Sequence, residues 1–180
     1  MLLPEIINTP RLQLRKPVIE DASSIYDNYG TDPEVTRYLT WRPHESLKDS
    51  LAALLARLAC WEANTEFSWT ITPQGEPGTV MGMISVTPDR KQWRCSLGYV
   101  LARKHWGQGY MTEAVRGVIR MLFDQPGIFR VWAVADEQNF ASARVLEKAG
   151  MTREGILHRW SLHPNVSGLP RDCWCFAAIK

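Results

Sequence analysis

The sequence predicts a single mixed α/β domain of 180 residues, with a largely antiparallel sheet and one parallel strand pair. Three observations support this fold class. The length suits one domain, because chains divide into separate domains only beyond roughly 250 residues. A hydrophobic share of 45% is enough for a sizeable core. The apolar period changes from helical to alternating and back, and a strand–helix–strand unit in the second half requires a parallel connection.

The first third of the chain begins with a strand and continues with helices. Two leucines alternate with polar residues over 11–16, which predicts a half-buried strand. A short helix is expected over about 21–29, and Asp32 followed by proline predicts the start of another. Ser46 has an acid three residues later, as in a capping box, and leucines at helical spacing follow. The sequence therefore predicts a long helix over 47–64.

The rest of the chain alternates between the two periods. Alternating apolar residues predict three consecutive strands, and hence an antiparallel meander, over 67–71, 80–87 and 97–101. The remaining elements are a helix, a strand, a helix and two strands, expected over 109–125, 130–135, 141–149, 153–162 and 174–179. The helix that follows the strand at 97–101 returns the chain to a parallel partner at 130–135.

Composition and charge exclude several classes of protein. The net charge is only +2, so no strong basic field exists for direct nucleic-acid binding. The most apolar stretch, 51–61, is far shorter than the roughly 20 residues of a membrane span, and the start lacks a signal-peptide pattern. We therefore expect a cytoplasmic protein without membrane contact. The four cysteines include no CxxC pair, and His158 and His163 lack partners at ligand spacing, so no metal site is expected.

The segment 97–114 is the most informative part of the chain for chemistry. It reads as a strand, a basic loop with two glycines, and a helix. Gly107 and Gly109 free the backbone so that N–H groups converge at the helix N-terminus, where a diphosphate is favoured. Relief of a tight turn is the structural alternative. A Rossmann fingerprint would need a third glycine where Thr112 lies, and a P-loop would need Lys-Ser or Lys-Thr where Tyr110 and a methionine follow.

Two motifs in the second half match known landmarks. Lys104-x-x-Gly107-x-Gly109 lies in this loop, and Asn139-x-x-Ser142 opens a segment that ends at Gly150. Both resemble motifs of the GNAT acetyltransferases, which hold acetyl-coenzyme A at the first motif and place the second beside the thioester. Further segments are similar to the RimJ/RimL-type branch, at 9–15, 32–35, 41–44, 106–114, 163–167 and 171–172. Named members of that branch acetylate N-terminal amines of ribosomal proteins, and the resemblance covers nearly the whole chain.

The resemblance implies a fold, a cosubstrate and a set of site residues. The fold is GNAT-like over 1–180: a mostly antiparallel twisted sheet, a central parallel pair splayed around the cofactor, and helices on both faces. The cosubstrate is acetyl-coenzyme A. By this resemblance, backbone groups of Val100 and Leu101 would bind the pantetheine, as would Asn139, and Ser142 would lie near the thiolate. The hydroxyl of Thr112 would add a contact. The diphosphate would be held by the loop residues Lys104, Trp106, Gly107, Gln108, Gly109 and Tyr110. Lysine replaces the family's usual Gln or Arg at 104, yet a cation beside a diphosphate stays favourable.

Asn139 and Ser142 are thereby the catalytic candidates, with a helix N-cap and a solvated hydroxyl as their structural alternatives. In the branch member best known for N-terminal alanine acetylation, a glutamate base and a tyrosine acid occupy the positions of Val134 and Leu146. Neither side chain can move a proton, so that mechanism does not transfer.

The general base is consequently left open. Many relatives also have an acid at the position of Ser96. Glu113 either has a structural role, supporting the helix N-terminus or holding the loop, or takes the substrate proton. Cys95, considered as a covalent nucleophile, has no activating partner at recognisable spacing.

A protein or peptide N-terminal α-amine, for example that of a ribosomal protein, is the acceptor predicted for a site without a strong base. Deprotonating an α-amine of pKa about 7.7–8.0 at pH 7 costs about 1–1.4 kcal/mol, whereas lysine near 10.4 costs about 4.6 kcal/mol. Orientation of a bound amine supplies roughly 7–11 kcal/mol of the barrier. The alternatives are a small-molecule amine such as an amino acid, polyamine or antibiotic, and a non-catalytic acyl-coenzyme A-binding module.

Tryptophans bear on the acceptor side. Trp41 and Trp61 flank the long early helix, and the segment from Trp41 to His44 is a candidate lining of the acceptor pocket, with aromatic packing as the alternative. Trp69 and Trp132 are expected to face the core. An exposed final strand would offer a homodimer contact.

Overall fold

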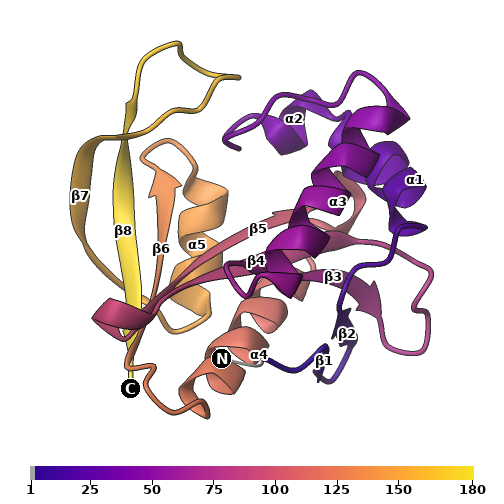
Figure 1. Ribbon diagram of the computed structural model, residues 1–180. Coiled ribbons are helices and arrows are strands. Elements are labelled where there is room, and N and C mark those ends of the chain that lie inside the picture. Colours follow the sequence, from indigo (N-terminus) through magenta and orange to yellow (C-terminus); the bar gives the residue numbers. More distant parts are fainter. Residues whose placement is uncertain (1–2) are drawn as a thin grey trace.

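The computed structural model describes residues 3–180 as an eight-stranded mixed sheet with helices on both faces (Figure 1). The strands are β1 (Ile6–Asn8), β2 (Leu12–Arg15), β3 (Phe67–Pro73), β4 (Gly82–Asp89), β5 (Arg94–Leu101), β6 (Arg130–Asp136), β7 (Thr152–Ser161) and β8 (Arg171–Ile179). The helices are α1 (Asp21–Ile25), α2 (Pro33–Thr36), α3 (Leu47–Glu62), α4 (Tyr110–Phe123) and α5 (Phe140–Lys148), with short helical turns η1 (Tyr26–Gly30), η2 (Arg90–Gln92) and η3 (Arg103–His105).

The sheet has the strand order β1-β2-β3-β4-β5-β6-β8-β7. Every neighbouring pair is antiparallel except β5 and β6. The predicted fold class and its central parallel pair are therefore confirmed. Strand β1 was not predicted. The expectation of an exposed final strand is wrong, because β8 lies between β6 and β7.

Local sequence signals explain where the early helices begin. Asp32 accepts a hydrogen bond from the backbone N–H of Glu34 at 2.9 Å, which caps α2 as its Asp-Pro start predicts. The side chain of Asp49 accepts from the backbone N–H of Ser46 at 2.9 Å, the reciprocal half of the predicted capping box. Helix α3 ends at Glu62, two residues before the predicted boundary.

The two faces of the sheet carry different helices. Side chains of α4 and α5 pack on one face, in a core that includes Trp69, and α1 and α3 pack on the other with Val80 and Met83. Trp61 belongs to the first core, where its ring lies edge-on to Trp69. Trp132 was expected in the core and is only partly buried, because Val131, Ala133 and Ala135 take the inward positions of β6. Within residues 3–180, no helix is long and apolar enough to cross a bilayer.

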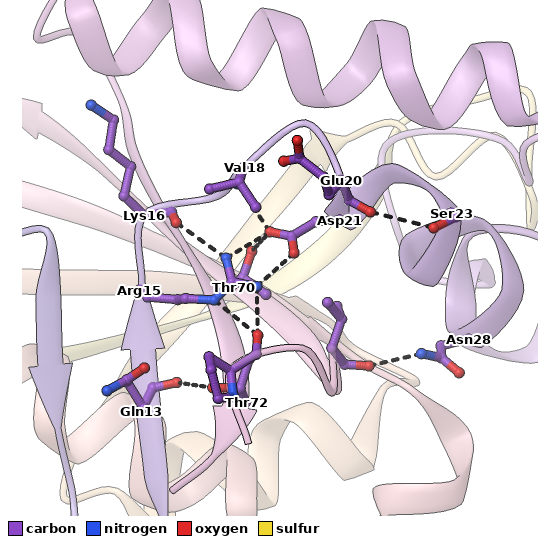
Figure 2. A network of polar contacts seen from close by, with 12 residues as sticks. Gln13, Arg15, Lys16, Val18, Glu20, Asp21, Ser23, Asn28, Thr70 and Thr72 are labelled. Atoms are coloured by element: carbon purple, nitrogen blue, oxygen red, sulfur yellow. Dashed lines mark hydrogen bonds and ion pairs between the residues drawn. The ribbon is translucent and has the colours of Figure 1, made fainter. Parts of the chain in front are cut away.

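A buried ion pair fixes the N-terminal helices to the sheet (Figure 2). Asp21, at the start of α1, accepts hydrogen bonds from both Nη atoms of Arg15 at 2.8 and 2.6 Å. It also accepts from the Val18 backbone N–H and the Thr70 hydroxyl, at 3.1 and 3.0 Å. These contacts join α1 to β2 and β3, and they position the η1 turn that follows α1.

Candidate active site

Strands β5 and β6 run side by side only where they begin. They pair at Arg94 with Arg130, Cys95 with Val131 and Ser96 with Trp132. Strand β5 then continues to Leu101 alongside β4, while β6 continues to Asp136 alongside β8. Backbone groups of β5 and β6 that a continuous sheet would pair with each other are therefore parted along the second half of both strands.

The loop after β5 turns into α4 through two left-handed glycines. Gly107 has φ 75° and Gly109, the N-cap of α4, has φ 78°. Only glycine adopts this region without steric cost, so both glycines are required by the backbone. The first helical hydrogen bond joins the N–H of Glu113 to the carbonyl of Gly109 at 3.0 Å. The N–H groups of the preceding turn, which includes Tyr110 and Thr112, point out of the helix end, where an anion is favoured.

Arg11 and Glu113 hold this loop from outside. Arg11 Nε donates to Glu113 Oε2 at 2.6 Å, and Arg11 Nη1 donates to the Gln108 carbonyl at 3.0 Å. Thr9 donates its hydroxyl proton to Glu113 Oε1 at 2.7 Å. Burial raises the pKa of Glu113, but hydrogen bonds from Thr9 and Arg11 outweigh it, and the net pKa is lowered. Glu113 is an anchored carboxylate, and of its two predicted roles the geometry matches support of the loop.

The side chains of Lys104, Trp106 and Gln108 are exposed, and each donates a hydrogen bond. Lys104 Nζ donates to Asn28 Oδ1 of η1 at 2.8 Å. Trp106 Nε1 donates to the Leu101 carbonyl at 2.7 Å, and Gln108 Nε2 donates to the Lys104 carbonyl at 3.1 Å. The indole of Trp106 thus uses the carbonyl of Leu101, one of the two β5 residues expected to bind the pantetheine through the backbone.

The second motif reaches the split between the strands through a pair of hydroxyls. Asn139 caps α5 by accepting from the Ser142 backbone N–H at 3.1 Å, so its oxygen has the structural role named as the alternative. The Ser142 hydroxyl lies 2.8 Å from the Tyr99 hydroxyl of β5. Burial raises the pKa of Tyr99, although the Ser142 contact opposes this. Tyr99 was not predicted as a site residue. Its alternation with Leu97 indicates that it faces inward, but no local pattern indicates its contact with Ser142, 43 residues away.

Two other ionisable groups near the split are constrained. Burial raises the pKa of the Cys95 thiol to about 11, which leaves it protonated and without an activating base. Asp136, at the end of β6, accepts from Arg171 Nε at 2.5 Å. Burial raises the pKa of Asp136, yet the hydrogen bond and charge of Arg171 outweigh it and the net pKa is lowered. Asp136 is therefore a structural anion.

A cavity of about 320 Å³ lies between α3 and the other face of β4 and β5. Val100 of β5, Arg57 and Glu66 contribute to its lining, together with the rings of Trp41 and His44. Those two rings stack, with centroids 4.9 Å apart. The predicted acceptor-side segment from Trp41 to His44 and the predicted cofactor strand thus meet at one cavity.

The loop between β7 and β8 contacts the segment that contributes Trp41 to this cavity. Asn165 Nδ2 donates to the carbonyls of Thr36 and Trp41, both at 2.8 Å. In Figure 1 this loop approaches the segment around α2. His163 of the same loop is buried, with Nε2 3.8 Å from Asp136 Oδ2. Among residues 3–180, no three His, Cys, Asp or Glu side chains form a group able to hold a metal ion.

Comparison with known proteins identifies the family. The profile of the family described as "Acetyltransferase (GNAT) domain" matches residues 11–152. The uncharacterized N-acetyltransferase YoaA of Bacillus subtilis (strain 168) is 28% identical over 176 residues, which cover 97% of both chains.

Solved structures agree on the fold. The microcin C7 self-immunity acetyltransferase MccE, in complex with acetyl-CoA and AMP, superposes with a TM-score of 0.87 at 19% identity, covering 99% of this chain and 98% of that one. RimL, a ribosomal L7/L12 α-N-protein acetyltransferase in complex with coenzyme A, gives a TM-score of 0.85 at 19% identity, covering 97% and 98%. The family profile matches most of the chain, and the sheet divides between β5 and β6. This protein therefore belongs to the GNAT acetyltransferase family and is an N-acetyltransferase that uses acetyl-coenzyme A.

Proposed function

We propose that this enzyme transfers the acetyl group of acetyl-coenzyme A to the N-terminal α-amine of a protein or peptide, with ribosomal proteins as the first candidates. The observation that carries the acetyl-transfer part of the proposal is the Tyr99–Ser142 contact, because it brings the second family motif on α5 directly to the split strand β5. The resemblance to the RimJ/RimL-type branch and the fold shared with RimL support the acceptor class.

The residues around the split fit the cosubstrate. The glycine turn at Gly107 and Gly109 and the free N–H groups of the first turn of α4 suit a diphosphate, with Lys104 adding positive charge nearby. The parted edge of β5 at Val100 offers backbone groups to the amides of the pantetheine. Asn139 and Ser142 lie at the start of α5 beside that strand.

Transfer proceeds by direct attack of the neutral amine on the acetyl carbonyl. A nitrogen–carbon bond forms, the carbon–sulfur bond breaks, and the sulfur leaves as a thiolate while the amine loses one proton. Tyr99 keeps its proton at neutral pH because burial raises its pKa, so its hydroxyl and that of Ser142 can donate to the thiolate. The Tyr99–Ser142 pair replaces the tyrosine acid of relatives, whose position Leu146 occupies.

An α-amine suits this site better than a lysine. Asp136 and Glu113 are engaged by arginines, and Cys95 is protonated, so none of these three is a strong free base. The cost of deprotonating the acceptor at pH 7 is about 1–1.4 kcal/mol for an α-amine and about 4.6 kcal/mol for lysine. Proximity to the thioester readily offsets the smaller cost.

Thiol release tests the proposal. Purified enzyme and acetyl-coenzyme A are incubated with peptides bearing free N-termini, with the same peptides carrying blocked N-termini and one lysine, and with amino acids and polyamines. We expect turnover on the free N-termini only, with the acetyl group located there by mass spectrometry. Turnover confined to the small amines would replace the protein acceptor, and tight binding of acetyl-coenzyme A without turnover on any amine would indicate a non-catalytic binding module. Comparison of ribosomal-protein masses from a deletion strain would then identify the natural N-terminus.

A further inference from the structure

His44 lines the cavity beside Val100, and three contacts hold it in place; these contacts are called the cradle below. Its ring stacks on Trp41, and its Nδ1 lies 2.6 Å from the Ser50 hydroxyl of α3. Its backbone N–H donates to the Gly30 carbonyl at 2.8 Å. These contacts fix both the backbone and the ring plane of a side chain that lines the cavity.

Gly30 shows how closely the cradle fits the imidazole. A Cβ placed on Gly30 would lie 2.9 Å from His44 Nδ1 and 3.4 Å from Ser50 Oγ. A side chain at position 30 would therefore displace the ring or break its hydrogen bond. The ion pair of Asp21 with Arg15 holds α1, and the η1 turn that ends at Gly30 follows directly from α1.

Only one of the two ring nitrogens of His44 is engaged by the cradle. Nδ1 faces Ser50, so Nε2 is the atom available to a molecule in the cavity. In the tautomer in which Nδ1–H donates to the serine oxygen, Nε2 carries a lone pair and can accept a proton. The Ser50 hydroxyl is buried inside α3 and makes this hydrogen bond at short range.

We propose that His44 is the general base of the reaction: Nε2 accepts a proton from the acceptor ammonium, directly or through one water, before the amine attacks the thioester. This inference rests on the proposed function and supplies the base that Val134 and Ser96, at the positions where relatives have an acidic residue, cannot provide. The imidazole takes up one proton for each amine deprotonated and returns it to solvent, so no other reactant is required.

The charges around His44 are compatible with this role. Burial lowers the pKa of His44, and the carboxylate of Asp49 in the first turn of α3 opposes the shift. The other titratable groups of the cavity include the hydroxyl of Tyr29 and the ion pair of Arg57 with Glu66. In that pair Arg57 Nη1 lies 2.6 Å from Glu66 Oε1. The net pKa is below its usual value, so the ring is neutral and able to accept a proton at pH 7.

His44→Gln tests the proposal, because the glutamine amide reaches the place of Nε2 but cannot act as the base. We expect kcat on a free N-terminal peptide to fall about 100-fold at pH 7, within the range that general bases contribute. Calorimetry should give a Kd for acetyl-coenzyme A within twofold of wild type. His158→Gln is the matched control, since His158 is exposed on β7 and is expected to keep full activity.

The pH profile distinguishes a base from a residue that only shapes the pocket. The wild-type rate should stay constant as the pH is lowered and fall only below about pH 6.5, because the enzyme deprotonates the bound ammonium itself. The His44→Gln rate should instead rise about tenfold per pH unit up to the α-amine pKa near 8. Added imidazole should partly restore activity to His44→Ala.

Each outcome decides the question. A His44→Gln variant with wild-type kcat and profile, or with a lowered kcat and an unchanged profile, overturns the role of His44 while leaving the proposed acceptor in place. If wild type acetylates only small amines, the protein acceptor fails and the same comparison is made on those amines. If wild type acetylates no amine, both proposals fail.

Discussion

Removal of the buried carboxylate at Asp21 should destabilise the whole N-terminal half of the fold. Asp21 is 4% exposed, and its Arg15 partner has a side chain only 13% exposed. Breaking a buried pair by removing one partner typically costs about 3–5 kcal/mol, because the remaining charge is left uncompensated. In Asp21→Ala, Arg15 keeps two carbonyl partners, those of Pro77 and Lys16, so we expect a loss near 3 kcal/mol. For a chain of this length that corresponds to a Tm lower by about 6–12 °C.

Calorimetry and urea unfolding measure this loss. Glu5→Ala is the matched control, because Glu5 pairs with Lys16 at 3.1 Å on a carboxylate that is 65% exposed, and such pairs contribute about 0–1 kcal/mol. An Asp21→Leu, Arg15→Met double variant should recover much of the lost stability, since apolar replacement of a buried pair removes both charges. If Asp21→Ala is no less stable than Glu5→Ala, the reasoning about burial of this pair is refuted.

Three further predictions concern the site. Gly109→Ala forces an alanine to φ 78°, which costs about 1–2 kcal/mol. Acetyl-coenzyme A should therefore bind at least tenfold more weakly to this variant by calorimetry. Gly78→Ala is the control and should bind acetyl-coenzyme A normally, because an added Cβ there meets no atom within 4 Å. Tyr99→Phe removes the phenol beside α5 and should lower kcat about tenfold or more in the thiol-release assay, with the Kd of acetyl-coenzyme A unchanged. The pKa of Asp136 is lowered in the fold, so its pairing with Arg171 stabilises the protein above about pH 4 and loses this effect as the pH falls through the lowered pKa. The difference in unfolding free energy between wild type and Asp136→Asn should therefore shrink in acid, and a constant difference from pH 7 to pH 3 would contradict the assignment.

Local signals predicted most of the fold. The capping pattern at Ser46 and the glycines at 107 and 109 act over a few residues, and each was observed where expected. Strand β1 was missed because it has only three residues and too short an alternation to recognise. Trp132 was misplaced because a large apolar side chain was assigned to the core, whereas small alanines next to it fill the space against α5.

The site was harder to predict because its decisive contacts are long-range. Arg11 and Glu113 are 102 residues apart and Tyr99 and Ser142 are 43 apart, so no spacing in the sequence indicates that they meet. The family motifs located the loop and the start of α5, but the tyrosine that joins α5 to the split strand became visible only in three dimensions.

The double hydrogen bond of Asn165 has a consequence for how the two halves of the sheet are held together. They are paired directly at only three positions, where β5 and β6 begin. The Tyr99–Ser142 contact joins β5 to α5 farther along, and Asn165 adds a link from the β7–β8 loop to Thr36 and Trp41. The width of the split is therefore set by contacts on both of its sides, not by the strand pairing alone.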